Sequence, residues 1–145
     1  MGQWMVFLLK TIIAAAVAVF GGKHLYQLDH TAIISAAGVL STVAGVLFGF
    51  ILASLTLLTS FDSSKGLIGA LKKNNVLQGI IKGLFSTGNT LIAGCLSALI
   101  SMFAPQVLQF NVDYFFLLLS FSYLIISVIT FCYNWKNFSS IITYV

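Results

Sequence analysis

Few side chains of this sequence are suited to covalent catalysis. The chain of 145 residues contains no Arg or Glu, and its acidic side chains are three Asp. Its two cysteines, Cys95 and Cys132, lie within apolar runs and are interpreted as small buried hydrophobic residues. The sequence contains no glycine-rich phosphate loop, zinc-protease helix, nucleophile elbow or Cys-x-x-Cys pair. We therefore expect a protein that is not an enzyme and that uses no cofactor.

One short polar stretch, with His24, Asp29 and His30, contains residue types that bind metals. Their spacing is irregular and no fourth ligand is obvious, so we expect no metal site. Asp113 stands at the start of the last apolar run, where a carboxylate complements the positive end of a helix. We expect a structural role for it.

The second apolar run carries a stripe of small and hydroxyl side chains on one face of the helix that it predicts. The stripe follows alternating steps of three and four residues, which keeps it on that face. A second series with steps of four, from Ala37 to Ala53, overlaps it. The main series, in which Leu52 is the one large residue, is Ser35, Gly38, Thr42, Gly45, Gly49, Thr56 and Thr59.

Small residues at this spacing let helix backbones approach closely in lipid. Two interpretations are open: the face packs within one subunit, or it packs against copies of itself and lines a water path. We expect the second, because a hydroxyl group gains nothing from facing lipid. The expected pore-lining residues of this run are Ser35, Thr42, Gly49 and Thr56. The expected oligomer contacts are Gly45, Gly49 and Ala53.

The third apolar run repeats the pattern in two neighbouring stripes with steps of four, one starting at Ser86 and the other at Asn89. Asn89 either bonds a neighbouring helix or sits at a pore constriction. Because the fourth run is bulky and apolar, we expect the second and third runs to face inward and the fourth to face lipid. The expected pore-lining residues here are Asn89, Ser97 and Ser101, and the expected oligomer contacts are Gly94 and Ala98.

These side chains lie in four apolar segments. The composition of the chain indicates that the segments are surrounded by lipid and not by water. Apolar residues make up 59% of the chain and charged residues 7%, whereas a soluble domain has about 25% charged residues. This excludes a soluble enzyme, a disordered linker and a secreted disulfide scaffold. A membrane-crossing helix needs about 20 apolar residues. We expect an all-α membrane protein with a single transmembrane domain, whose four spans cover residues 4–22, 31–60, 85–104 and 113–133.

Lysine placement predicts the orientation of these spans. Residues 61–84, between the second and third spans, carry four lysines, whereas the stretch between the third and fourth spans carries none. The positive-inside rule therefore predicts that residues 61–84 and both termini are cytoplasmic. These lysines set the topology and contact anionic lipid, or they form a basic mouth that binds a polyanionic ligand. They are Lys65, Lys72, Lys73 and Lys82.

A water path requires several copies of the chain, because the four helices of one subunit leave no axial hole of useful width. Cyclic homo-oligomers provide such a path by repeating one interface, and we expect a tetramer. Anions are favoured, because the second and third spans contain no carboxylate and the cytoplasmic mouth is basic. Lys10, within the first span, either snorkels to the headgroups or contributes to a ring of cations.

One stretch of the second run carries a resemblance to a known family. The residues concerned are Ser41, Ala44, Gly45, Ala53, Leu55, Thr56 and Leu58. This stretch resembles the RexB phage-exclusion proteins, which are short membrane proteins with four spans, and the layout is similar to that of Hailong-type anti-phage effectors. The resemblance implies an ion channel of the bacterial inner membrane that depolarises an infected cell. It also implies that the channel is held shut by short DNA oligomers made by a partner nucleotidyltransferase, with the lysine-rich segment as the DNA site.

These expectations combine into one functional hypothesis, an oligomeric ion channel gated from the cytoplasm. The alternative is a non-conducting scaffold or accessory subunit, in which the small-residue faces pack against a different partner. A membrane enzyme ranks last, since the hydroxyl groups are spread along the helices instead of gathering at one depth.

Overall fold

The computed structural model describes residues 3–24, 28–60, 76–104 and 111–143. Within these ranges the chain is helical, and its four helices are long and apolar enough to cross a membrane. The longer ones exceed the hydrocarbon core, since 30 Å of hydrocarbon corresponds to about 20 helical residues. The architecture is that of a multi-pass membrane protein. The helices are α1 (Gln3–His24), α2 (His30–Ser60), α4 (Val76–Phe103) and α5 (Val112–Thr143).

Local hydrogen bonds mark two of the helix ends. The amide of Ile33 donates to the carbonyl oxygen of Asp29 at 2.9 Å, which closes the first turn of α2. The last turn of α4 closes with a bond of 2.8 Å from the Ala104 amide to the Ile100 carbonyl. Pro105 follows in the sequence, and a proline has no amide hydrogen with which to continue a helix.

Two helices are longer than the spans expected from hydropathy. α4 begins at Val76 rather than near residue 85, and α5 continues to Thr143 rather than ending near residue 133. Hydropathy marks the part of a helix that lies in lipid, whereas backbone hydrogen bonds can continue into the polar region beyond it. The first part of α4 therefore belongs to the stretch 61–84 that we expected to be cytoplasmic.

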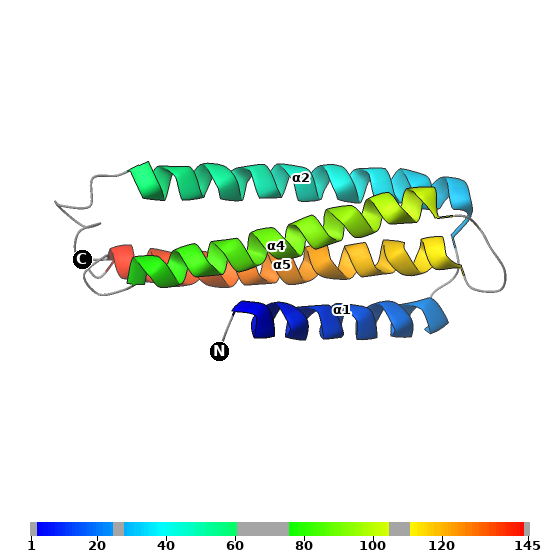
Figure 1. The fold of residues 1–145 in the computed structure, drawn as a ribbon, viewed down its shortest axis with the longest axis horizontal. Helices are drawn as coiled ribbons and strands as arrows, with labels where there is room; N and C mark the ends of the chain where they lie inside the picture. The colour runs from blue at the N-terminus through cyan, green and yellow to red at the C-terminus, as the bar shows by residue number, and fades with distance from the viewer. Residues whose placement is uncertain (1–2, 25–27, 61–75, 105–110, 144–145) are drawn as a thin grey trace.

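The helices are arranged with α4 and α5 in the middle, α2 on one side and α1 on the other (Figure 1). α4 packs along α5, α2 packs mainly on α4, and α1 packs mainly on α5. In the described part of the chain α1 and α2 do not contact each other. One long side of α2 and one long side of α1 therefore have no partner within the protomer.

The close contact between α4 and α5 depends on small side chains. A Cβ atom added at Gly94 would lie 3.2 Å from the Cβ of Tyr123 and 3.6 Å from the carbonyl oxygen of Ser120. The Ser120 hydroxyl donates to the carbonyl oxygen of Gly94 at 2.8 Å. Small residues and hydroxyl groups thus join these helices, as is usual where lipid removes the hydrophobic driving force.

α5 does not lie at the periphery of the bundle as expected, because it contacts all three other helices. Part of its surface, with Phe121 and Ile129, is nevertheless exposed. Its side chains Tyr114, Leu117 and Tyr123 are buried, and so are the serines at 120, 122 and 127. The bulky residues of α5 fill the core, while its serines allow close approach. In the sequence, bulky apolar residues dominate this run and mask the serines.

Candidate functional site

The four residues of α2 that we expected to line a pore lie on one exposed face of the helix. Ser35, Thr42, Gly49 and Thr56 are all exposed in the protomer. Gly45 and Ala53, the expected oligomer contacts of α2, are exposed as well. We call these six residues the α2 stripe.

The helix period explains why the stripe remains on one side. Seven residues rotate by about 700°, which is about 20° short of two full turns. Ser35, Thr42, Gly49 and Thr56 follow one another at this interval, so they stay aligned along α2. The series with steps of four advances by about 40° per step. It therefore winds from Ala37, which is fully buried, to the exposed Ala53.

The middle of the stripe, at Gly45 and Gly49, has open space in front of it within the protomer. A Cβ atom added at Gly45 or Gly49 would have no neighbouring atom of another helix within 4 Å. The opposite side of α2, with Ile33, Ala44 and Ile51, is buried in the bundle. α2 therefore packs against the other helices of the protomer on one side only.

The hydroxyl groups of the stripe are satisfied by their own helix. Ser35 donates to the carbonyl oxygen of Thr31 at 3.0 Å, and Thr42 donates to that of Gly38 at 2.8 Å. Thr56 likewise donates to its fourth preceding carbonyl at 2.9 Å. Such bonds remove the cost of an unmet donor. The hydroxyl groups thus do not by themselves require water in front of them.

The expected pore residues of α4 are divided between its surface and its interior. Asn89 is exposed, whereas Ser97 and Ser101 are buried. Ser97 donates to the carbonyl oxygen of Ala93 at 2.8 Å. Ser101 donates to the backbone oxygen of Asp113 at 2.8 Å. Contrary to our expectation, these two serines are enclosed by the protomer's own helices, because this side of α4 packs on α5.

The expected oligomer contacts of α4 also lie inside the protomer. Gly94 is held against Tyr123 and Ser120 of α5, as described above. Ala98 is fully buried, in one cluster with Ile33 and Leu117. Both residues support close helix packing as the sequence pattern indicated, but they do so between helices of one chain.

A polar cluster that the sequence did not predict joins three helices at one end of the bundle. His30 Nδ1 lies 3.0 Å from Asp113 Oδ2, across 83 positions of the sequence. Asp113 Oδ1 also accepts the amide of Tyr114 at 2.8 Å, as expected for a carboxylate in the first turn of a helix. With the bond from Ser101, this links the start of α2, the end of α4 and the start of α5. The described residues contain no group of three metal-ligating side chains.

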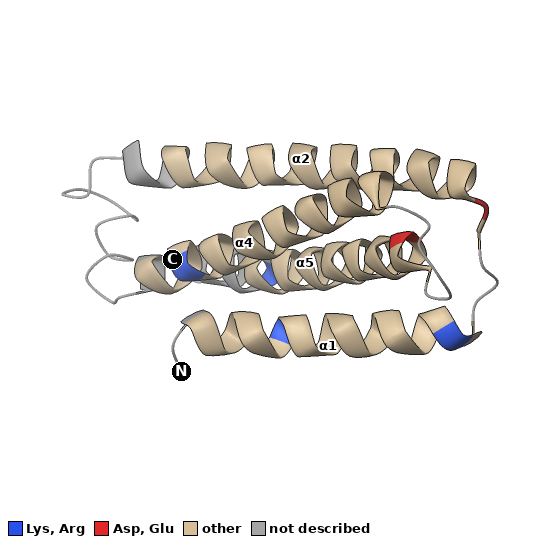
Figure 2. Ribbon diagram, turned by 45° about the vertical axis from the view of Figure 1, so that its right-hand side comes forward, with Lys and Arg blue, Asp and Glu red and all other residues tan. Residues whose placement is uncertain are grey.

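Charged residues differ between the two ends of the bundle (Figure 2). Asp29 and Asp113 lie at the end where α2 and α5 begin, and Lys23, in the last turn of α1, lies at this end as well. Lys82 lies near the start of α4 and Lys136 near the end of α5, at the other end. Lys82 and Lys136 are exposed. The other expected ligand-binding lysines, Lys65, Lys72 and Lys73, lie outside the described residues.

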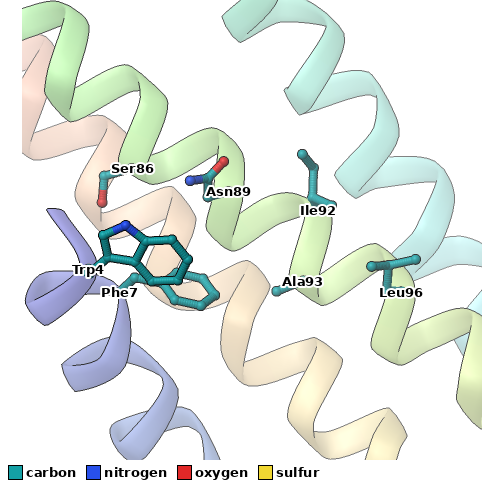
Figure 3. Close-up of a pocket in the computed structure, with 7 residues that line it drawn as sticks. All are labelled: Trp4, Phe7, Ser86, Asn89, Ile92, Ala93 and Leu96. Atoms are coloured by element: carbon teal, nitrogen blue, oxygen red, sulfur yellow. The ribbon is translucent and has the colours of Figure 1, made fainter.

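Lys10 is unusual because it is buried within a membrane-spanning helix. Its side chain is 9% exposed, and its Nζ donates to Ser86 Oγ at 3.1 Å, which joins α1 to α4. Its ammonium group therefore contacts α4 within the protomer. Beside this bond a crevice of about 400 Å³ separates the two helices (Figure 3). Its walls are Trp4, Phe7, Ser86, Asn89, Ile92, Ala93 and Leu96.

In comparisons with known proteins, no family model, curated protein or solved structure matches this chain.

Proposed function

We propose that this chain is an ion-channel subunit that assembles through the α2 stripe into a symmetric homo-oligomer. The observation that carries the proposal is the unpartnered face of α2, where Thr42, Gly45 and Gly49 are exposed along a helix of 31 residues. Glycine and hydroxyl residues at heptad-like intervals suit close helix contact in lipid. A cyclic assembly repeats this contact around an axis, and a tetramer is the proposed form.

The conducting path is proposed to lie between subunits. Within one protomer, the space beside Ser127 amounts to about 60 Å³, and a water molecule occupies about 30 Å³ in the liquid. This space, where α2, α4 and α5 meet, is too small for a continuous column of water. An axis surrounded by several copies of α2 would present the backbone-bonded hydroxyl oxygens of Ser35, Thr42 and Thr56 to water.

Anions are the proposed permeant ions. α2 and α4 contain no carboxylate along their length, and Lys82 and Lys136 place positive charge at one end of the bundle. A basic mouth raises the local concentration of anions. We place this end in the cytoplasm of a bacterial cell, with the protein in the inner membrane, according to the positive-inside rule.

Cytoplasmic gating and a role in anti-phage defence rest on the resemblance to RexB and Hailong-type proteins. The proposed signal is a short DNA oligomer made by a partner nucleotidyltransferase and bound by Lys65, Lys72, Lys73 and Lys82. Changing all four to Gln tests this part of the proposal. Binding of single-stranded DNA should become weaker and less dependent on salt, and unchanged binding would restrict these lysines to orienting the chain.

Planar-bilayer recording of the purified protein tests conduction and selectivity together. The recording uses a tenfold gradient of potassium chloride and no DNA oligomer, since the oligomer is proposed to hold the channel shut. We expect the reversal potential to be shifted from zero toward the equilibrium potential of chloride. A reversal potential shifted toward the equilibrium potential of potassium would contradict anion selectivity. Silent bilayers containing correctly folded protein would contradict conduction.

The alternative is a non-conducting scaffold or accessory subunit, and one observation favours it. Because the hydroxyl groups of Ser35, Thr42 and Thr56 are bonded to their own helix, the α2 stripe can pack against a different membrane protein with no water path. In that case the purified chain would be monomeric and would not conduct.

A further inference from the structure

Lys10 lacks a counter-charge in the part of the chain that the structure describes. Asp29 and Asp113 precede or begin helices at the other end of the bundle, and Asp113 is bonded to His30. The Lys10 ammonium instead donates to the neutral hydroxyl of Ser86 at 3.1 Å. An ammonium group has three hydrogens to donate. A buried cation within a membrane span is costly without an anionic partner.

Ser86 can link Lys10 to a ligand in the crevice, because its hydroxyl group can accept one hydrogen bond and donate another. Its neighbours Thr87 and Thr90 donate their hydroxyl hydrogens to carbonyl oxygens of α4 at 2.9 and 2.8 Å. The Ser86 oxygen accepts from Lys10, so its own hydrogen remains available to a further acceptor. Ser86 lies in the crevice wall, where that acceptor would have to sit.

The other polar side chains of the crevice supply further donors. Asn89 is exposed, and its amide carries two N–H groups beside one accepting oxygen, while Trp4 carries one indole N–H. The Ser86 hydroxyl, the Asn89 amide and the Trp4 indole nitrogen lie toward the same end of the crevice (Figure 3). No carboxylate is among the residues that line it. Anion-binding sites in proteins combine a positively charged side chain with neutral hydrogen-bond donors. Lys10 and the donors of this crevice are such a combination.

The remaining walls are apolar and continue along α4. Ile92 and Leu96 follow Asn89 along the helix. Trp4 and Phe7 close the side formed by α1. A ligand with a negative head and an apolar chain would therefore meet matching walls at both ends.

We propose that the crevice between α1 and α4 binds a phosphate-type anionic group, held by Ser86 and Asn89 and neutralised by Lys10. Two sources share this chemistry: the headgroup of an anionic phospholipid, whose acyl chain would lie along Ile92 and Leu96, or free inorganic phosphate. The inference does not rest on the proposed channel function, because every group belongs to one protomer.

The lipid source is tested by native mass spectrometry of the full chain released from mixed micelles. Equal amounts of phosphatidylglycerol and phosphatidylcholine with the same acyl chains are supplied. We expect preferential retention of phosphatidylglycerol. Lys10→Met should reduce that preference by about 10- to 100-fold, the range expected for losing a charged hydrogen bond.

The free-anion source is tested by fluorescence in a Trp135→Phe background, which leaves Trp4 as the only indole of the two in the chain. The protein is placed in phosphatidylcholine nanodiscs and titrated with inorganic phosphate. A saturable change in Trp4 emission that disappears in Lys10→Met supports the site with phosphate as its ligand. If only phosphatidylglycerol is recognised, the site is supported with lipid as its ligand.

Matched variants separate the site from general charge and folding effects. Lys23→Met removes the same charge from the exposed last turn of α1 and should behave as the unmodified chain in both assays. Lys10→Arg should keep the preference, and Ser86→Ala should weaken it. Helicity from circular dichroism confirms that each variant is folded. The proposal is overturned if neither anion is recognised, or if Lys10→Met and Lys23→Met give equal results.

Discussion

The His30–Asp113 pair holds the end of the bundle where α2 and α5 begin. Asp113 is 2% exposed, so its carboxylate depends on protein groups instead of water. His30 and the Tyr114 amide supply two hydrogen bonds to it. A buried acceptor that loses a partner keeps its desolvation cost, so removing His30 should destabilise the fold more than breaking an exposed ion pair.

Replacing His30 with Ala is expected to lower the free energy of unfolding by about 1–3 kcal/mol, because it leaves the buried Asp113 without that partner. Thermal unfolding in detergent micelles, followed by circular dichroism, measures the change. His24→Ala is the control, since His24 is exposed at the end of α1. Equal effects of the two substitutions would show that the pair contributes nothing specific.

The sequence indicated a role for Asp113 at the start of a helix, and the structure shows Asp113 in the first turn of α5. The sequence did not indicate the pairing of Asp113 with His30. The two residues are separated by 83 positions, and their pairing depends on how α2 and α5 meet. Likewise, Ser97 and Thr42 are residues of similar type in similar patterns. Only the neighbouring helices determine that Ser97 is buried and Thr42 exposed.

Among the helices, α4 and α2 use glycine in different surroundings. Gly94 of α4 lies against Tyr123 of α5, whereas Gly49 of α2 has no neighbour within 4 Å. The same substitution therefore tests the stability of the protomer at Gly94 and the assembly of protomers at Gly49.

Gly94→Leu is expected to lower the free energy of unfolding by about 1–3 kcal/mol or more, because the added side chain forces α4 away from α5. Gly49→Leu should leave the protomer at least as stable, since leucine favours a helix more than glycine. In the same variant the oligomer should dissociate to smaller species. Chemical unfolding and light scattering of the purified proteins measure the two effects.

Ala16→Leu, on the exposed side of α1, controls for added bulk at a surface outside the proposed interface. An unchanged oligomer mass in Gly49→Leu would exclude the α2 stripe as the contact between subunits. A stable and unaltered Gly94→Leu variant would contradict the close packing of α4 on α5.

For the whole molecule, the four apolar runs were sufficient to predict a helical protein with four membrane-spanning helices. Pro105 also marked the end of α4 correctly. The arrangement of the helices was not predictable in the same way, because lipid-facing and buried positions of a membrane helix have similar hydropathy. This is why α5 was expected at the surface although Tyr114, Leu117 and Tyr123 pack in the core.

The alternation of the helices places the start of α1 and the end of α5 at the same end of the bundle (Figure 1). Reporter fusions test whether this end is cytoplasmic. A fluorescent protein fused after Val145 should be bright, and alkaline phosphatase inserted in residues 105–110 should be active, because the latter requires export. The reverse pattern would invert the topology and place Lys82 and Lys136 outside.

In the proposed channel, the α2 stripe of each subunit meets the α2 stripes of other copies around a water-filled path. In a chain with Cys95→Ala and Cys132→Ala, the variant Thr42→Cys is recorded in planar bilayers before and after a charged thiosulfonate reagent. Val17→Cys, on the exposed side of α1, is the matched control. We expect the reagent to change the current through Thr42→Cys by more than half and to leave the current through Val17→Cys unaltered. Equal responses of the two variants, or a Thr42→Cys current that the reagent leaves unchanged, would contradict this arrangement.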